Sequence, residues 1–169
     1  RGLPVEHFIA ACNVNDVVPE YLRTEILQPK ETVATISNAM DVGDPSNFVR
    51  ILELFDKEFN QVKNKLSGYT IDDEETLKTI KRVEKDYGYV LDPHGAVAFV
   101  ALEKYLTEND GKGFFLETAH PVKFPDSVEQ ATGKSVEIPK SLEELMKQEK
   151  FTTEINPQYE ELKEFLLKK

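Results

Sequence analysis

Amide, hydroxyl and carboxylate side chains gather directly after three apolar runs of this 169-residue chain. The runs cover residues 5–12, 32–36 and 113–117, and each contains the β-branched or aromatic residues typical of strands. Polar side chains in such places hold ligands by hydrogen bonds, but their types specify no reaction. The residues concerned are Asn13, Asn15 and Asp16; Ser37, Asn38, Asp41 and Asp44; and Thr118 and His120.

Several kinds of site chemistry are disfavoured by spacing. His7, His94 and His120 match no metal-ligand pattern, so we predict no metal site. Ser37 lacks the G-x-S-x-G context of a nucleophilic serine. The eight glycines are too scattered for a phosphate-binding loop. His94 falls in the first turn of a predicted helix, where we expect an exposed side chain.

The elements that must position these residues alternate between strand and helix along the chain. A fourth strand is predicted at 68–71, and apolar residues recur at helical spacing between the strands. The predicted helices cover about 17–27, 48–65, 73–87, 93–102, 126–132, 141–148 and 156–168. Such alternation is typical of a parallel sheet covered by helices.

We therefore expect a single α/β domain over residues 1–169, built as a three-layer structure with a mostly parallel sheet and helices on both faces. The carboxyl ends of parallel strands share one edge of the sheet, so the polar residues after the strands should line one ligand site. A local alternative exists for some of them, because Asn13, Asp44 and Asp92 also suit turns or helix caps.

Composition narrows the class of protein. A net charge of −10 argues against nucleic-acid binding, which depends on cationic contacts. No apolar run is long enough for a membrane span and no signal-peptide pattern is present, so we expect a cytoplasmic protein without a membrane partner. The single cysteine, Cys12, lies in an apolar run, which favours an inert buried thiol over a nucleophile. A first residue of Arg1 rather than Met indicates a piece of a longer protein.

Four segments resemble, in order, sequence blocks of the threonine synthase family. The most specific is residues 35–50, TISNAMDVGDPSNFVR, and the likeness extends from Gly2 to about Gly133. The other three segments are residues 8–16, 92–98 and 118–124. The chain is similar to the C-terminal portion of these enzymes, the large C-terminal domain of the fold.

The resemblance implies a pyridoxal-phosphate enzyme with the tryptophan-synthase-like fold. Such a lyase converts O-phosphohomoserine and water to threonine and phosphate in threonine biosynthesis, with the cofactor as electron sink. The lysine that forms the internal aldimine, and the loop that binds the cofactor phosphate, belong to family blocks upstream of this chain. The resemblance therefore assigns no catalytic residue here and implies that the isolated chain is inactive. Its implied partners are O-phosphohomoserine, the missing N-terminal part of the enzyme, and a second copy in a homo-oligomer.

The resemblance also assigns binding residues. Thr118 places a neutral hydroxyl against the pyridine nitrogen of the cofactor, and Asn13 and Asn15 line the cofactor side. The residues assigned to the substrate are Ser37, Asn38, Asp41, Ser46, Asn47 and Arg50. Arg50 suits a phosphate because guanidinium and phosphate pair bidentately, although it also suits the exposed face of its helix. Two alternatives stay open: another pyridoxal-phosphate-dependent lyase or dehydratase acting on a phospho-substrate, and a non-catalytic α/β binding module.

Overall fold

Two short parallel strands form the sheet of the computed structural model, which describes residues 4–149 and 151–168. β1 (Phe8–Cys12) pairs with β2 (Leu66–Thr70), with Phe8 opposite Leu66 and Cys12 opposite Thr70. The ladder continues by one bond, because the Ile71 amide donates to the Cys12 carbonyl oxygen at 2.9 Å. The predicted strands at 5–12 and 68–71 are therefore confirmed.

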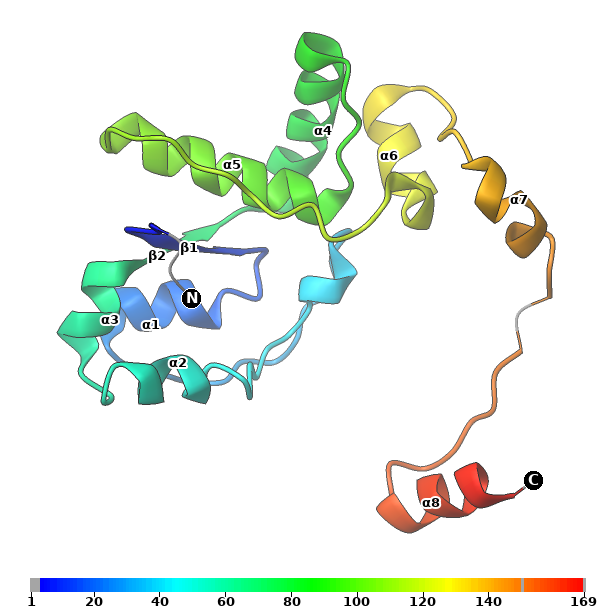
Figure 1. The fold of residues 1–169 in the computed structure, drawn as a ribbon, viewed down its shortest axis with the longest axis horizontal. Coiled ribbons are helices and arrows are strands. Elements are labelled where there is room, and N and C mark those ends of the chain that lie inside the picture. The colour runs from blue at the N-terminus through cyan, green and yellow to red at the C-terminus, as the bar shows by residue number, and fades with distance from the viewer. Residues whose placement is uncertain (1–3, 150, 169) are drawn as a thin grey trace. The chain divides into compact units, whose positions relative to one another are not determined.

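Helices cover both faces of this sheet. In Figure 1 the strands lie between α5 (Pro93–Glu108) on one side and α1 (Val17–Thr24) with α3 (Phe59–Lys65) on the other. The other elements up to Glu137 are the helices α2 (Val49–Leu54), α4 (Asp73–Tyr87) and α6 (Pro125–Thr132), and the 3₁₀ turns η1 (Asn38–Met40) and η2 (Pro121–Lys123). This arrangement confirms the predicted α/β class with helices on both faces of a parallel sheet.

The chain from Ile138 onward forms a second compact unit, which contains α7 (Lys140–Met146) and α8 (Tyr159–Leu167). The helices predicted at 141–148 and 156–168 are confirmed. The single domain over residues 1–169 stays a prediction, and its two ends, like Gly2 where the family likeness begins, lie outside the described residues. None of the described helices is long and apolar enough to cross a membrane.

The strand side chains divide between the two faces as the period of two requires. Ala10 and Leu66 pack with α1 and α3, whereas Ala11, Tyr69 and Ile71 pack with α5. The buried residues of the first cluster are Tyr21, Leu22, Phe48, Val62 and Leu66. A further cluster joins α4, α5 and α6 through Ile80, Val83, Leu91, Ala96 and Ala131. The polar loops are thus attached to a packed scaffold.

Local signals set both ends of α4 and the start of α5 as predicted, whereas α5 continues to Glu108, beyond the expected end near residue 102. The Asp72 side chain caps α4 by accepting from the Glu75 amide at 2.8 Å, and the Asp92 side chain caps α5 by accepting from the His94 amide at 2.9 Å. Gly88 ends α4 in the left-handed conformation, with φ of 66°. These caps fix where α5 begins, and therefore where His94 lies.

The long helix predicted over 48–65 is wrong, because the structure has two helices there, α2 and α3. Asp56 and Lys57 have positive φ angles of 52° and 61°. The Lys57 amide donates to the Leu52 carbonyl oxygen at 2.8 Å, which closes a Schellman motif at the end of α2. The apolar residues keep helical spacing across this break, so periodicity could not detect it.

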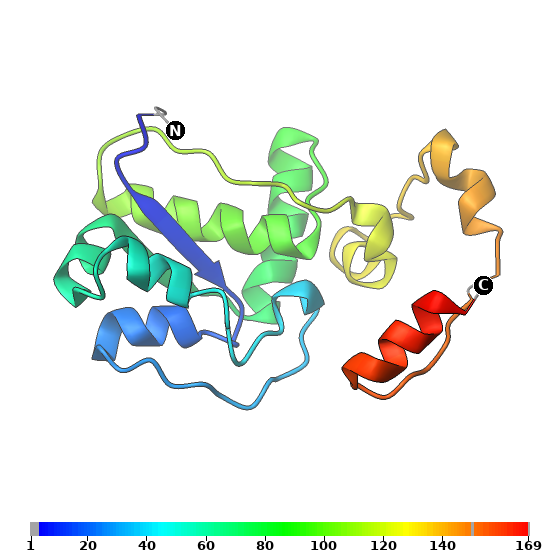
Figure 2. The same ribbon diagram turned by 60° about the horizontal axis from the view of Figure 1, so that its bottom comes forward.

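The strands predicted at 32–36 and 113–117 are also wrong, because both segments are irregular in the structure. A strand needs a neighbouring backbone to accept and donate its hydrogen bonds. Residues 32–36 bond instead to side chains. The segment after α5 runs back along that helix (Figure 1 and Figure 2), where Phe115 stacks edge-on against Phe99 at a centroid distance of 5.5 Å. Its burial still alternates, since Phe114 and Leu116 are exposed.

Candidate functional site

A buried hydrogen-bond network joins the loop after β1 to the loop before α2. The Asn13 side chain, only 1% exposed, donates through Nδ2 to Thr35 Oγ1 at 2.8 Å, Ser37 Oγ at 3.0 Å and Asp41 Oδ1 at 2.8 Å. Its Oδ1 accepts from the backbone amide and from the side-chain amide of Asn15, both at 2.9 Å. The structure therefore brings together Asn13, Asn15, Ser37 and Asp41, as expected for residues at one edge of the sheet.

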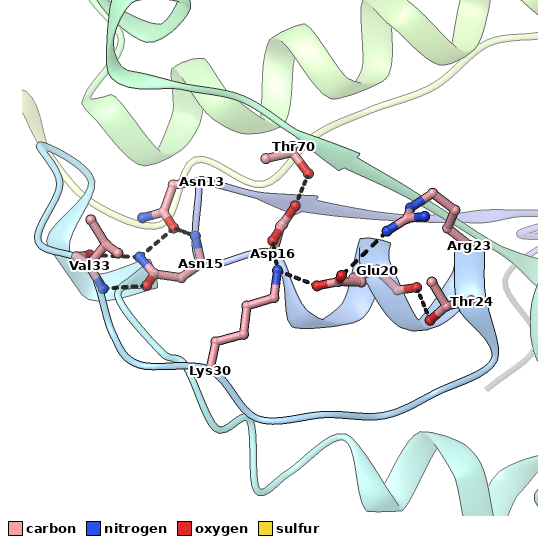
Figure 3. Close-up of polar contacts among 9 residues, drawn as sticks. All are labelled: Asn13, Asn15, Asp16, Glu20, Arg23, Thr24, Lys30, Val33 and Thr70. Atoms are coloured by element: carbon pink, nitrogen blue, oxygen red, sulfur yellow. Dashed lines mark hydrogen bonds and ion pairs between the residues drawn. The ribbon is translucent and has the colours of Figure 1, made fainter.

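The Asn15 side chain makes the hydrogen bonds to the Val33 backbone that a neighbouring strand would otherwise make (Figure 3). Its Nδ2 donates to the Val33 carbonyl oxygen at 2.8 Å, and its Oδ1 accepts from the Val33 amide at 2.8 Å. This pair of bonds satisfies the backbone groups that a sheet ladder would otherwise pair. The predicted strand at 32–36 is replaced by an irregular segment for this reason.

Asp41 organises the same loop from its other end. Its carboxylate accepts from the Thr35 backbone amide at 2.9 Å and from the Thr35 hydroxyl at 2.7 Å. It also accepts from the side-chain amide of Asn15 at 3.1 Å, besides the bond from Asn13. A carboxylate accepts about four hydrogen bonds, so its capacity is filled within the protein. The network is a rigid base for the loop rather than a set of free ligand donors.

The other predicted site residues lie at the surface. Asn38 starts η1, Ser46 and Asn47 precede α2, Arg50 is in its first turn, and Thr118 directly follows Glu117. All five side chains are exposed: Asn38, Ser46, Asn47, Arg50 and Thr118. Exposed hydroxyl, amide and guanidinium groups can meet a ligand, so these residues suit contact with one better than the buried network does.

A second polar cluster connects the η1 loop to the start of α5. His94 is buried, contrary to expectation, and its Nε2 accepts from the Ala39 amide at 3.1 Å. Because Nε2 is an acceptor, the ring proton is assigned to Nδ1, which faces Asp92 Oδ1 at 2.6 Å. The loop that contains Ser37 and Asp41 is therefore attached by His94 to the N-terminal end of α5.

Glu117, which the sequence did not single out, completes this cluster. Its Oε1 accepts from the Asp92 amide at 3.2 Å. Burial, together with a hydrogen bond to the Asp92 carboxyl, raises the pKa of Glu117 to about 8. Burial opposes ionisation of Asp92 as well, but the hydrogen bonds from His94 and Glu117 outweigh it and lower the pKa of Asp92. The signal in the sequence was positional: Glu117 occupies an inward position two residues after the partly buried Phe115.

Cys12 is half-buried at the end of β1. Burial, with a contribution from the nearby Asp16 carboxylate, raises the pKa of the Cys12 thiol to about 12. A thiol with such a pKa is a poor nucleophile at neutral pH, which supports the prediction of an inert cysteine. Among the described residues, no group of three histidine, cysteine, aspartate or glutamate side chains gathers as a metal site would require.

A hollow of about 300 Å³ lies beside the first network, between the start of α1 and the end of β2. Its charged groups pair with one another (Figure 3): Lys30 bonds to Asp16 at 2.6 Å and to Glu20, and the Thr70 hydroxyl donates to Asp16 at 2.8 Å. The hollow is lined by Asp16, Pro19, Glu20, Arg23, Lys30, Gly68 and Thr70. These pairs anchor the loop after α1. Because the charged groups bond to one another, we assign no ligand to the hollow.

Comparison with known proteins identifies the fold. Residues 95–166 match the family model described as the C-terminal part of threonine synthase. Threonine synthase of Escherichia coli is 49% identical over 144 residues, which are 85% of this chain and 33% of that protein. The enzyme of Buchnera aphidicola from Acyrthosiphon pisum is 42% identical over 168 residues, 99% of this chain and 38% of that protein. The chain thus spans about a third of the length of the curated relatives it matches.

Solved structures agree with these sequence matches. The E. coli threonine synthase structure superposes with a TM-score of 0.85 at 43% identity, covering 98% of this chain and 38% of that one. A pyridoxal-phosphate-bound threonine synthase from Brucella melitensis gives 0.83 at 27% identity, covering 98% and 40%. The fold is therefore the one that these threonine synthases share, pyridoxal-phosphate fold type II. Within that fold class, the chain is a homologue of the C-terminal portion of threonine synthase.

Proposed function

We propose that this chain is the C-terminal part of an enzyme that converts O-phosphohomoserine and water to threonine and phosphate with pyridoxal phosphate. The main support is the match to E. coli threonine synthase, which extends over 98% of the chain at a TM-score of 0.85. Pyridoxal phosphate, when bound, supplies the electron sink for the carbanions of this chemistry. The residues of this chain would bind and orient the cofactor and substrate.

The neutral hydroxyl and amide groups of this chain are compatible with the pyridine ring of such a cofactor. Thr118 offers an exposed hydroxyl at a point fixed by the adjacent Glu117, and it would hydrogen-bond to the pyridine nitrogen. A hydroxyl cannot hold that nitrogen protonated as an ionised aspartate would, so the electron demand of the ring is moderate. Asn13 and Asn15 direct their hydrogen bonds into the protein, and we propose that they act on the cofactor side by fixing the loop.

Substrate contacts are proposed for the exposed groups at the start of α2. Ser46 and Asn47 offer a hydroxyl and an amide, and Arg50 offers a planar cation for the substrate phosphate. Asn38 is proposed as a further substrate contact, from the exposed face of η1. Ser37 and Asp41 support the same loop from within.

The cofactor-binding lysine is proposed to lie in the part of the enzyme that this chain does not cover. No lysine in the chain has the sequence context expected of it. We therefore propose that the isolated 169-residue chain is inactive. In the complete enzyme it acts together with the remaining part, and we propose a cytoplasmic homo-oligomer.

The direct test is an assay of the full-length protein with O-phosphohomoserine. We expect threonine and phosphate in equal amounts, and no product from the isolated chain. Formation of 2-oxobutyrate instead would assign the enzyme to a different lyase reaction. Absence of any product from the full-length protein would refute the proposed function.

Replacing Thr118 with valine in the full-length protein should weaken cofactor binding by about tenfold and slow turnover. Valine keeps the shape but loses the hydroxyl, which removes one hydrogen bond of roughly 1.4 kcal/mol. Cofactor titration followed by absorbance would measure the change. Thr118→Ser keeps the hydroxyl and serves as the control. Equal affinity and absorbance for the valine variant would rule out this role of Thr118.

Replacing Arg50 with alanine should raise the KM for O-phosphohomoserine by about tenfold or more, because a bidentate guanidinium–phosphate pair is lost. The kcat should change less than the KM. Arg23→Ala, which removes an exposed arginine from α1, is the matched control and should leave both constants unchanged. An unchanged KM in Arg50→Ala would indicate that Arg50 only occupies the exposed face of its helix.

A further inference from the structure

Two buried carboxyl oxygens near the start of α5 have no hydrogen-bond donor among the described residues. They are Asp92 Oδ2 and Glu117 Oε2. The two carboxyl groups are neighbours, because Glu117 Oε1 accepts from the Asp92 amide at 3.2 Å and each group shifts the pKa of the other. Two ionised carboxylates in contact would repel, and each buried lone oxygen would lose its hydration without compensation. One proton placed between these two oxygens removes both problems.

We propose that Asp92 and Glu117 share one proton, and that this acid pair positions the segment that bears Thr118 against the start of α5. The inference about Thr118 rests on the proposed function, whereas the shared proton does not. Glu117 is in this view a positioning residue for the site and not a catalytic one.

The surrounding hydrogen bonds indicate which carboxyl carries the proton. Asp92 caps α5 and accepts from the His94 amide at 2.9 Å and from the His94 ring at 2.6 Å, so it is the ionised partner. A negative charge at a helix N-terminus is favourable. Glu117 accepts from the Asp92 amide through Oε1, which leaves Oε2–H to donate to Asp92 Oδ2. Burial raises the pKa of Glu117, in agreement with this assignment.

Gly95 provides the space for this pair. A Cβ atom at position 95 would lie 2.0 Å from Glu117 Oε2, so only glycine lets the carboxyl approach the helix. The pair is also continuous with the loop on the other side of the site, because His94 accepts from the Ala39 amide. One chain of hydrogen bonds thus connects the loop at Ala39 to the residue before Thr118.

The test compares Glu117→Gln with Glu117→Leu in the full-length protein. Glutamine reproduces the protonated acid, because its oxygen accepts from the Asp92 amide and its NH₂ donates to the Asp92 carboxylate. We expect kcat, KM and cofactor affinity of Glu117→Gln to stay within about threefold of the parent protein. Leucine leaves the Asp92 amide and Asp92 Oδ2 without a partner, so cofactor affinity should fall by about tenfold or more. A glutamine variant that behaves like the leucine variant, or does not fold, would overturn the proposal.

A second measurement needs no activity. The folded protein retains the Glu117 proton above the unfolded-state pKa, so between about pH 5 and pH 8 it binds one more proton than the unfolded state. The stability of the parent relative to Glu117→Gln should therefore fall as pH rises through this window. The titratable groups that face Glu117 are its partner Asp92 and, beside the pair, His94 and Tyr89; the glutamine variant retains all three.

Infrared spectroscopy reports the proton itself. The parent protein should show a carboxylic-acid carbonyl band at about pH 6 that is absent from Glu117→Gln and disappears well above the raised pKa. Glu31→Gln, at an exposed glutamate, is the matched control and should leave the band and the pH profile unchanged. Lack of the band at about pH 6 would refute the shared proton. Failure of threonine formation with the band present would instead count against the proposed function.

Discussion

Replacing Asn13 with aspartate is expected to destabilise the protein by about 4 kcal/mol, because it places an unpaired charge in a buried network. The Nδ2 atom of Asn13 now donates to Asp41 Oδ1 at 2.8 Å. A carboxylate oxygen at that position has no proton to donate and repels the Asp41 carboxylate. Thr35 and Ser37 would lose the same donor. Urea unfolding of parent and variant would measure the difference.

The matched control is Asn47→Asp, the same chemical change at an exposed asparagine in the same part of the chain. A surface change of this kind should alter stability by about 0.5 kcal/mol or less. The deficit of Asn13→Asp should also shrink toward acidic pH, since two adjacent carboxyls can share a proton there. Equal stability of Asn13→Asp and the parent at neutral pH would contradict the network as the base of the loop.

Replacing Gly43 with alanine is expected to destabilise the protein by about 3 kcal/mol through a backbone clash. The new Cβ would lie 2.2 Å from the Lys30 carbonyl oxygen and 2.9 Å from Thr32 Oγ1. Gly43 also accepts from the Lys30 amide at 2.8 Å and donates to Thr32 at 3.1 Å. The alanine would therefore push apart the segments at residues 30–32 and at residue 43, which hydrogen-bond to each other. Thermal or urea unfolding would detect the loss.

The control variant Gly88→Ala distinguishes this clash from the backbone strain of an alanine in the left-handed conformation. Gly88 has a positive φ of 66°, but a Cβ there meets nothing within 4 Å. Alanine at this position should cost only about 1 kcal/mol, the usual penalty of the left-handed conformation. If Gly43→Ala were no worse than Gly88→Ala, the close approach of Gly43 to Lys30 would not hold in the protein.

The candidate site was partly predictable. Asn13, Asn15, Ser37 and Asp41 converge as expected for polar residues at one edge of a sheet, and local sequence identified all four. Their hydrogen bonds to one another were not predictable, because bond partners more than twenty residues apart depend on how the loops pack. Glu117 was missed, since a single acidic residue in an apolar segment gives no sign that it will meet a second carboxyl.

The fold shows the same division. By itself, the sequence determined the family likeness, the α/β class, and the starts of α4 and α5, because a cap such as Asp72 or Asp92 acts on amides two or three residues away. Only the tertiary structure decided that residues 32–36 pair with the Asn15 side chain instead of a strand. It also decided that Glu117 meets Asp92, 25 residues distant. The physical reason is that buried polar groups must find partners, and which partners lie within reach depends on the packed elements.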